Sequence, residues 1–146
     1  MAEADSFSIR SADWHRDAAD IARIRRRVFI EEQAVPESLE WEAWDAECDW
    51  FIARDGSGDI IGIARLTPDA RIGRMAVLPA WRRRGVGSAL LQAALARARQ
   101  KGLARVELHA QTHALGFYAR QGFVAHGPEF DEAGIPHRAM FLALTE

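Results

Sequence analysis

The sequence predicts an α/β fold built on a mixed, mostly antiparallel sheet of about six or seven strands. Short apolar runs separated by tight turns lie in the middle of the chain, which is typical of consecutive antiparallel strands. Segments with apolar residues at three- and four-residue steps lie on either side of them and predict helices. One such helix connects two strands, so these two strands should run parallel to each other.

The chain should begin with a strand and an amphipathic helix. Phe7 and Ile9 indicate the strand, and Ser11 or Asp13 can cap the helix that follows. The helix alternates an apolar side with an outer side rich in arginine. Its apolar residues are Trp14, Ala18, Ile21, Ile24 and Val28, and its outer arginines are Arg16, Arg23, Arg26 and Arg27. Pro36 ends any continuing helix, and a second, shorter helix carrying Trp41 and Trp44 should follow.

Tight turns divide the next part of the chain into three strands. Residues 50–53 form the first of them, the Asp-Gly-Ser-Gly turn at 55–58 follows, and residues 60–66 pair back. A second turn at 67–69 leads to the strand at 71–78. Such consecutive strands imply an antiparallel meander.

The remaining elements follow an Ala/Leu-rich helix that runs to Gly102, a residue suited to a left-handed C-cap. Residues 105–110 alternate apolar and polar side chains, which predicts a strand parallel to the strand at 71–78. The last expected elements are a helix from about 113 to 121, a strand at 123–125, a loop at 127–136 and a buried apolar strand at 138–144.

Length and composition favour one soluble globular domain over residues 1–146, with 49% hydrophobic and 27% charged residues. No apolar run is long enough to span a membrane and the N-terminus lacks a signal-peptide pattern, so we expect a cytoplasmic protein without a membrane partner. Cys48 is the single cysteine and cannot form an internal disulfide. A net charge of −2 gives no basic field that would recruit nucleic acid.

The charges are unevenly distributed along the chain. Eighteen of the nineteen basic residues are arginines, and none lies between Val28 and Ala53. That segment carries instead the acidic residues Glu31, Glu32, Glu37, Glu40, Glu42, Asp45, Glu47 and Asp49. It should attract cations, and Trp41 and Trp44 could add cation–π contacts to a cationic substrate. The alternative is that both tryptophans are core residues beside a short helix.

An anion-binding site is predicted where the strand at 71–78 leads into the Ala/Leu-rich helix. The first turn of this helix contains Arg82, Arg83, Arg84, Gly85, Val86, Gly87 and Ser88. Unpaired N–H groups and the helix dipole favour an anion there, and two glycines would let a phosphate approach the backbone closely. The alternative is an ordinary helix N-terminus whose arginines are exposed to solvent and bind no ligand. Neither a Walker loop nor a dinucleotide fingerprint fits, because no lysine precedes Ser88 and position 90 is Leu90.

The pattern Arg-x-x-Gly-x-Gly at 82–87 resembles the acyl-CoA pyrophosphate loop of the GNAT superfamily of N-acetyltransferases. Residues 114–123 resemble that family's A-x-x-F-Y-x-x-x-G-F segment. Residues 28–33 with Pro36, and residues 134–137 with Met140, are similar to the ElaA-like branch. The resemblance therefore covers essentially the whole chain. It implies helices on both faces of the sheet and a splay between the fourth and fifth strands.

This resemblance implies an acetyl-CoA-dependent N-acetyltransferase that acts on a small-molecule or peptide amine, by direct attack in a ternary complex and without a metal. Main-chain groups of Met75, Ala76 and Val77 would contact the pantetheine arm, and residues 82–88 would hold the pyrophosphate. No Cys–His pair is placed for an acetyl-enzyme. A non-catalytic acyl-CoA-binding module and a polyphosphate-binding patch are the alternative functions. Exposed strand edges would allow a homodimer.

Three residues are the candidates for proton transfer. Tyr118, the only tyrosine, would protonate the departing thiolate, since a phenol titrates near 10 and a thiol near 8.5; alternatively it is a core residue with its hydroxyl at a wet edge. A lysine-like amine is neutral in only about one molecule per thousand at pH 7, so a base must help. Residues 71–74 offer no glutamate, which leaves Glu32 and His137. A solvated carboxylate and a loop histidine bonded to the backbone are the alternatives. Weaker candidates are His109, Gln111 and His113.

Overall fold

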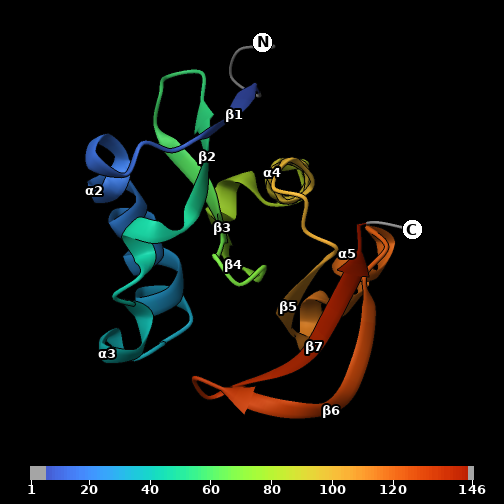
Figure 1. Cartoon of the computed structure of the whole chain (residues 1–146). Coiled ribbons are helices and arrows are strands. Elements are labelled where there is room, and N and C mark those ends of the chain that lie inside the picture. Colours follow the sequence, from blue (N-terminus) through green and yellow to red (C-terminus); the bar gives the residue numbers. More distant parts are fainter. Residues whose placement is uncertain (1–5, 145–146) are drawn as a thin grey trace.

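The computed structural model describes residues 6–144, whose seven strands form two antiparallel sheets. The first sheet has the order β1-β2-β3-β4 and the second the order β5-β7-β6, as Figure 1 shows. The strands are β1 (Phe7–Ser11), β2 (Asp49–Asp55), β3 (Ile60–Leu66), β4 (Ile72–Val77), β5 (Arg105–Gln111), β6 (Val124–Glu132) and β7 (Ile135–Ala143). The predicted α/β fold with mostly antiparallel pairing is confirmed.

β4 and β5 run parallel and touch at one end only. Arg71 and Glu107 form an isolated parallel bridge, in which the N–H of Glu107 donates to the carbonyl of Ala70 at 3.0 Å. Beyond this bridge, β4 pairs with β3 and β5 pairs with β7. The two strands diverge in Figure 1, which confirms the predicted splay.

Helices α2 (Trp14–Arg25) and α4 (Val86–Gln100) cover opposite faces of the first sheet (Figure 1). Two separate apolar clusters form there, one around Ile21 and Ile24 of α2 and the other around Leu90 and Leu91 of α4. β3 lies between them and is buried along its whole length, as expected for a strand covered on both faces. Asp13 caps α2, since its carboxylate accepts from the N–H groups of two residues in the first turn.

β3 and α4 approach each other closely at Gly62. A Cβ atom there would lie 3.0 Å from Cδ1 of Leu90 and 3.1 Å from Cγ1 of Val86. A larger residue would therefore push away the first turns of α4. Glycine at this position fixes the start of α4 against the sheet.

α2 continues directly into the π-helix η1 (Arg26–Glu32). The N–H of Gln33 reaches the carbonyl of Val28 at 3.0 Å, a spacing of five residues. Shorter elements complete the fold: α3 (Glu37–Glu40), η2 (Asp45–Glu47), η3 (Pro79–Trp81), η4 (Thr112–Ala114) and α5 (Leu115–Arg120).

The structure corrects three details of the sequence interpretation. Trp41 and Trp44 lie outside both α3 and η2, so the helix predicted to carry them does not form. The segment 127–136 is not a loop, because β6 and β7 continue as a hairpin to a turn at Ala133 and Gly134, both at positive φ. β7 is only partly buried, because His137 and Met140 are its only buried residues and the others are half-buried or exposed.

Candidate active site

A cavity of about 780 Å³ opens where β4 and β5 diverge. Its walls come from β4, β5, η1, α3 and the tip of the β6–β7 hairpin. The expected site residues that line it are Met75, Ala76, Val77, Arg82, Glu32, Tyr118 and His137. The fold therefore brings together three candidate proton-transfer residues that lie far apart in the sequence. His109, Gln111 and His113 also line this cavity.

The first turn of α4 fits a diphosphate group. Gly85 is its N-cap at φ 86°, and no side chain caps the helix. The N–H groups of Val86, Gly87 and Ser88 have no acceptor among residues 6–144. A Cβ added at Gly85 would meet nothing within 4 Å, and one at Gly87 would make only ordinary contacts, the nearest at 3.6 Å to Phe117. Gly85 and Gly87 are therefore not tightly packed, and the unpaired N–H groups beside them suit an anion.

Arg82 connects this loop to the π-helix. Its two terminal nitrogens donate to the two carboxylate oxygens of Glu32, each at 2.7 Å, and its Nε donates to the carbonyl of Val77 at 2.9 Å. The hydrogen bond from Arg82 lowers the pKa of Glu32. Both carboxylate oxygens are therefore engaged, and the lowered pKa makes Glu32 a weaker proton acceptor.

Tyr118 projects from α5 to β4. Its hydroxyl lies 3.4 Å from Sδ of Met75, and its ring packs edge-on against Phe117 and Phe123. Burial raises the pKa of Tyr118 to about 12, so the phenol is protonated at neutral pH. A thioether is a weak acceptor, and the proton stays available to a stronger one.

His137 is held in one tautomer by the backbone. Its Nδ1 lies 2.6 Å from the carbonyl of Ile135, and since a carbonyl only accepts, we place the proton on Nδ1. Its Nε2 lies 3.8 Å from Oε2 of Glu132. The other oxygen of Glu132 lies 2.8 Å from Nδ1 of His109, whose Nε2 lies 3.3 Å from Arg71. Neutral His137 thus presents an unprotonated Nε2 to the cavity.

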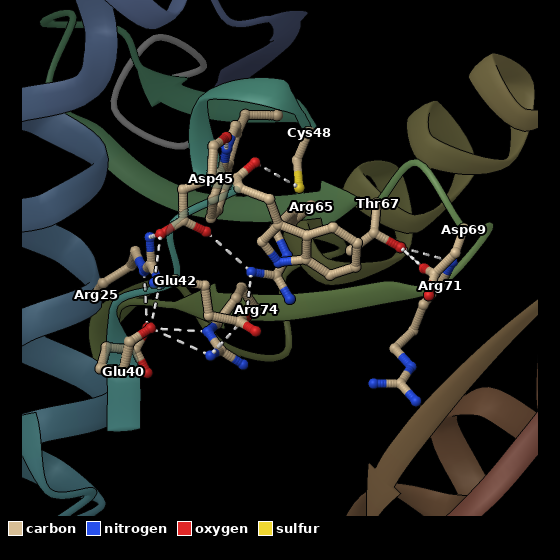
Figure 2. A network of polar contacts seen from close by, with 12 residues as sticks. Arg25, Glu40, Glu42, Asp45, Cys48, Arg65, Thr67, Asp69, Arg71 and Arg74 are labelled. Atoms are coloured by element: carbon tan, nitrogen blue, oxygen red, sulfur yellow. Dashed lines mark hydrogen bonds and ion pairs between the residues drawn. The ribbon is translucent and has the colours of Figure 1, made fainter. Parts of the chain in front are cut away.

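A buried network of arginines and carboxylates forms the wall of the cavity beside η1 and α3 (Figure 2). Its members are Arg25, Arg65 and Arg74 with Glu40, Glu42 and Asp45. Arg25 donates to Glu40 at 2.7 Å and to Asp45 at 2.9 Å, and its side chain is 1% exposed. The three cations and three anions balance, so no charge is left uncompensated in the interior.

Carboxylates and tryptophans of the acidic segment contact the arginines of this network. The guanidinium of Arg25 lies 4.7 Å from the ring centre of Trp41, and that of Arg65 lies 5.9 Å from the ring centre of Trp44. The cations that this segment attracts are therefore arginines of the same chain. Both tryptophans are only half-buried and belong to neither apolar cluster, so the interpretation of them as core residues is wrong; they pack against these arginines instead.

The pKa of Asp45 reflects two opposed effects. Burial raises it, but hydrogen bonds from Arg25, from the backbone of Glu42 and from Arg65, together with attraction to Arg25, outweigh burial and lower the pKa overall. A lowered folded-state pKa stabilises the protein above the unfolded value of about 4, and this contribution is lost as the pH falls further. The cavity wall should therefore loosen in acid.

No helix within residues 6–144 is long and apolar enough to cross a membrane. No group of three or more His, Cys, Asp or Glu side chains in this part of the chain is arranged to hold a metal ion.

Comparisons with known proteins agree with this geometry. Residues 12–144 match the family model described as an acetyltransferase (GNAT) domain. The chain is 33% identical over 139 residues to the uncharacterised protein YyaT of Bacillus subtilis, which covers 92% of this chain and 94% of YyaT. An acyl-CoA N-acyltransferase structure from Pseudomonas aeruginosa superposes with a TM-score of 0.82 at 28% identity, over 94% of this chain and 100% of that one. Escherichia coli ElaA shares the fold, with a TM-score of 0.82 at 23% identity over 93% of this chain and 99% of its own.

Replacing Arg25 should destabilise the fold strongly. Arg25→Leu removes one of the three cations that balance three carboxylates, so Glu40 keeps only Arg74 and Asp45 only Arg65 as an ion-pair partner among residues 6–144. The network then holds an excess negative charge, and we expect a loss of about 3–5 kcal/mol in the free energy of unfolding. Arg23→Leu on the same helix removes an exposed pair with Asp20 and should cost less than about 1 kcal/mol. Urea unfolding of both variants measures the difference. Equal losses would show that the network contributes no more than a surface ion pair.

Proposed function

Since the chain belongs to the GNAT acetyltransferase family, we propose that it transfers an acetyl group from acetyl-CoA to a primary amine, by direct attack in a ternary complex. The family uses acyl-CoA donors and acts on amines; the acetyl group and the primary amine are the specific part of the proposal. A cytoplasmic location, a homodimer and one domain over residues 1–146 stay predictions from the sequence.

One observation carries this proposal. The edge of β4 that faces β5 makes no ladder beyond the Arg71–Glu107 bridge, and it runs from Met75 to Val77 towards the uncapped start of α4. An extended ligand arm could pair with that open edge while an anion at its end binds the N–H groups of residues 86–88. The arm and diphosphate of acetyl-CoA have this combination of properties.

The donor would supply a thioester, and this chain would supply the proton transfers. The new bond joins the amine nitrogen to the acetyl carbon, and the bond from that carbon to sulfur breaks. An acceptor that arrives as an ammonium first releases one proton to solvent. The neutral nitrogen then gives up one proton to Nε2 of His137 as it attacks, and the leaving sulfur takes one from the hydroxyl of Tyr118. Solvent then restores both side chains, so the net change moves one hydrogen from nitrogen to sulfur.

Burial decides whether Tyr118 can act as an acid. A phenol with a pKa of about 12 would donate to a thiolate of ordinary pKa, near 8.5, only against a cost of about 4–5 kcal/mol. Burial also raises the pKa of a thiol, as it does for Cys48, to about 11. A thiolate formed in the same apolar surroundings would therefore be a far better match for Tyr118.

The contacts favour His137 over Glu32 as the base. Glu32 is bound by Arg82 through both oxygens and its pKa is lowered, which weakens it as a proton acceptor. The carbonyl of Ile135 engages Nδ1 of His137 and leaves Nε2 as the nitrogen that can take a proton, which would then face the carboxylate of Glu132. We propose that Glu32 instead positions Arg82 beside the donor site.

Coenzyme A binding tests the donor site. Gly87→Asp places a carboxylate at the start of α4, where the helix dipole favours it, so the fold should keep its stability. The same charge should repel the diphosphate and weaken coenzyme A binding at least about tenfold in calorimetry. Gln100→Glu adds a charge near the other end of α4 and should leave the affinity unchanged. Tight binding of coenzyme A to the Gly87→Asp protein would contradict the placement of the diphosphate.

Removing the phenol hydroxyl tests the acid. Tyr118→Phe should lower kcat by roughly 10²–10⁴-fold, because the thiolate must then leave without a donor. Coenzyme A affinity and thermal stability should change little, since within residues 6–144 the hydroxyl has one hydrogen bond, to the weak acceptor Sδ of Met75. Steady-state kinetics and calorimetry on one preparation separate the two effects, and an unchanged kcat would rule out the acid role.

A pH profile separates the two candidates for the base. A base that protonates in acid makes kcat/KM fall toward low pH. His137→Gln should lower kcat/KM by roughly 10²–10⁴-fold and abolish that fall, whereas Glu32→Gln should keep it. His15→Gln, on an exposed position of α2, serves as the histidine control. If only the Glu32 variant lost the acid limb, Glu32 would be the base.

A further inference from the structure

Charged residues of both signs line the cavity in equal number. They are Arg65, Arg71, Arg74 and Arg82, with Glu32, Glu40, Glu42 and Glu132. Most of them are matched by ion pairs within the chain: Arg82 with Glu32, Arg74 with Glu40 and Glu42, and Arg65 with Glu42 and with Asp45 behind the wall. One cation and one anion are left over, Arg71 and Glu132.

Arg71 has no carboxylate within ion-pair distance among residues 6–144. The recorded contact of its guanidinium is with the ring nitrogen Nε2 of His109 at 3.3 Å. In Figure 2 the guanidinium extends away from the buried network, while the backbone N–H of Arg71 is fixed by the hydroxyl of Thr67 at 3.0 Å. Arg71 therefore presents a full positive charge to the cavity from a fixed point of the backbone.

The donor's diphosphate does not provide the anion for this cation. Arg71 precedes β4 and the proposed diphosphate loop follows it, so the length of the strand separates them. At about 3.3 Å per residue, six residues place these sites about 20 Å apart. The charge of Arg71 belongs to the opposite end of the cavity, beside the parallel bridge between β4 and β5.

Glu132 faces the same end of the cavity from the hairpin. Its two oxygens lie 2.8 Å from Nδ1 of His109 and 3.8 Å from Nε2 of His137, and its side chain is 47% exposed. The imidazole of His109 therefore stands between the guanidinium of Arg71 and the carboxylate of Glu132. Opposite charges at this separation match a small molecule that carries an anion and a cation close together.

We propose that the acceptor is a small amine that bears a carboxylate, as a free amino acid does. The carboxylate binds the planar guanidinium of Arg71, which suits two-point hydrogen bonding to carboxylates. The amine lies between Glu132 and His137, where Glu132 attracts its protonated form and Nε2 of His137 takes its proton. This inference rests on the proposed function and identifies the substrate class of the same site.

Matched acceptor pairs test the inference. The proteinogenic amino acids and their carboxamides share amine and side chain and differ in the carboxylate. With acetyl-CoA as donor, coenzyme A release should give a kcat/KM at least tenfold higher for the amino acid of the preferred pair. The carboxamide has lost the negative charge that favours protonation of the amine, so amine reactivity alone would favour the opposite order.

Arg71→Gln should reduce the preference for the carboxylate at least tenfold. Arg99→Gln, an exposed arginine at the end of α4 and outside the cavity, should leave it unchanged. Equal or better use of carboxamides, or the same preference in the Arg71→Gln protein, would overturn the inference and leave the acetyltransferase proposal standing.

Binding without turnover gives an independent readout. In calorimetry with the protein saturated with coenzyme A, the preferred amino acid should bind at least tenfold tighter than its carboxamide, and Arg71→Gln should remove the difference. Failure of every amino acid to bind or react would overturn the inference. Carboxylate-dependent binding without any coenzyme A release would support it and refute the proposed transfer, which separates the two failures.

Discussion

The single bridge between β4 and β5 is the constraint on which the rest of this structure depends. A continuous ladder would close the space between the two strands and satisfy the edge of β4 from within the chain. Instead each strand pairs with another partner, β3 or β7, and α4 connects them across the first sheet. The close contact of Gly62 with Leu90 and Val86 fixes the start of α4 at the end of that open edge. The cavity and the uncapped first turn of α4 thus share one geometric origin.

The buried ion pairs hold the second wall of the cavity. Arg25 links α2 to Glu40 of α3 and to Asp45 of η2. The same two carboxylates pair with Arg74 of β4 and Arg65 of β3, which connects α3 and η2 to the first sheet. Arg74 contributes from β4 at a φ of 45°, a conformation that costs a residue with a side chain about 1–3 kcal/mol. Its ion pairs with Glu40 and Glu42 offset this strain. The ion pairs of this network therefore determine how the elements of the wall are placed.

Much of the fold could be predicted from local sequence patterns. The ion pairs that form the cavity wall could not. The turns at 55–58 and 67–69, the Asp13 cap and the glycines of the first turn of α4 are local signals, and their structures agree with them. The partners of Glu40, Glu42 and Asp45 lie 15 or more residues away, and no periodicity shows which arginines will meet them. The sequence also showed no sign of the hairpin at 127–136. Its turn places Ala133 at a positive φ, a conformation that favours glycine, so alanine there does not indicate a turn. For the candidate site, the sequence singled out Tyr118, Glu32 and His137, but not the ion pair that engages Glu32 nor the unmatched Arg71.

Eighteen of the nineteen basic residues in this chain are arginines, and this affects how readily an acyl-CoA thioester could acylate its side chains. Thioesters acylate unprotonated amines without a catalyst, and lysine side chains are the groups that are usually modified. A guanidinium keeps its proton at any physiological pH and has no free electron pair to offer. The cations that hold the cavity wall are therefore immune to self-modification. The one lysine, Lys101, lies at the end of α4, pairs with Asp49 at 3.3 Å and does not line the cavity.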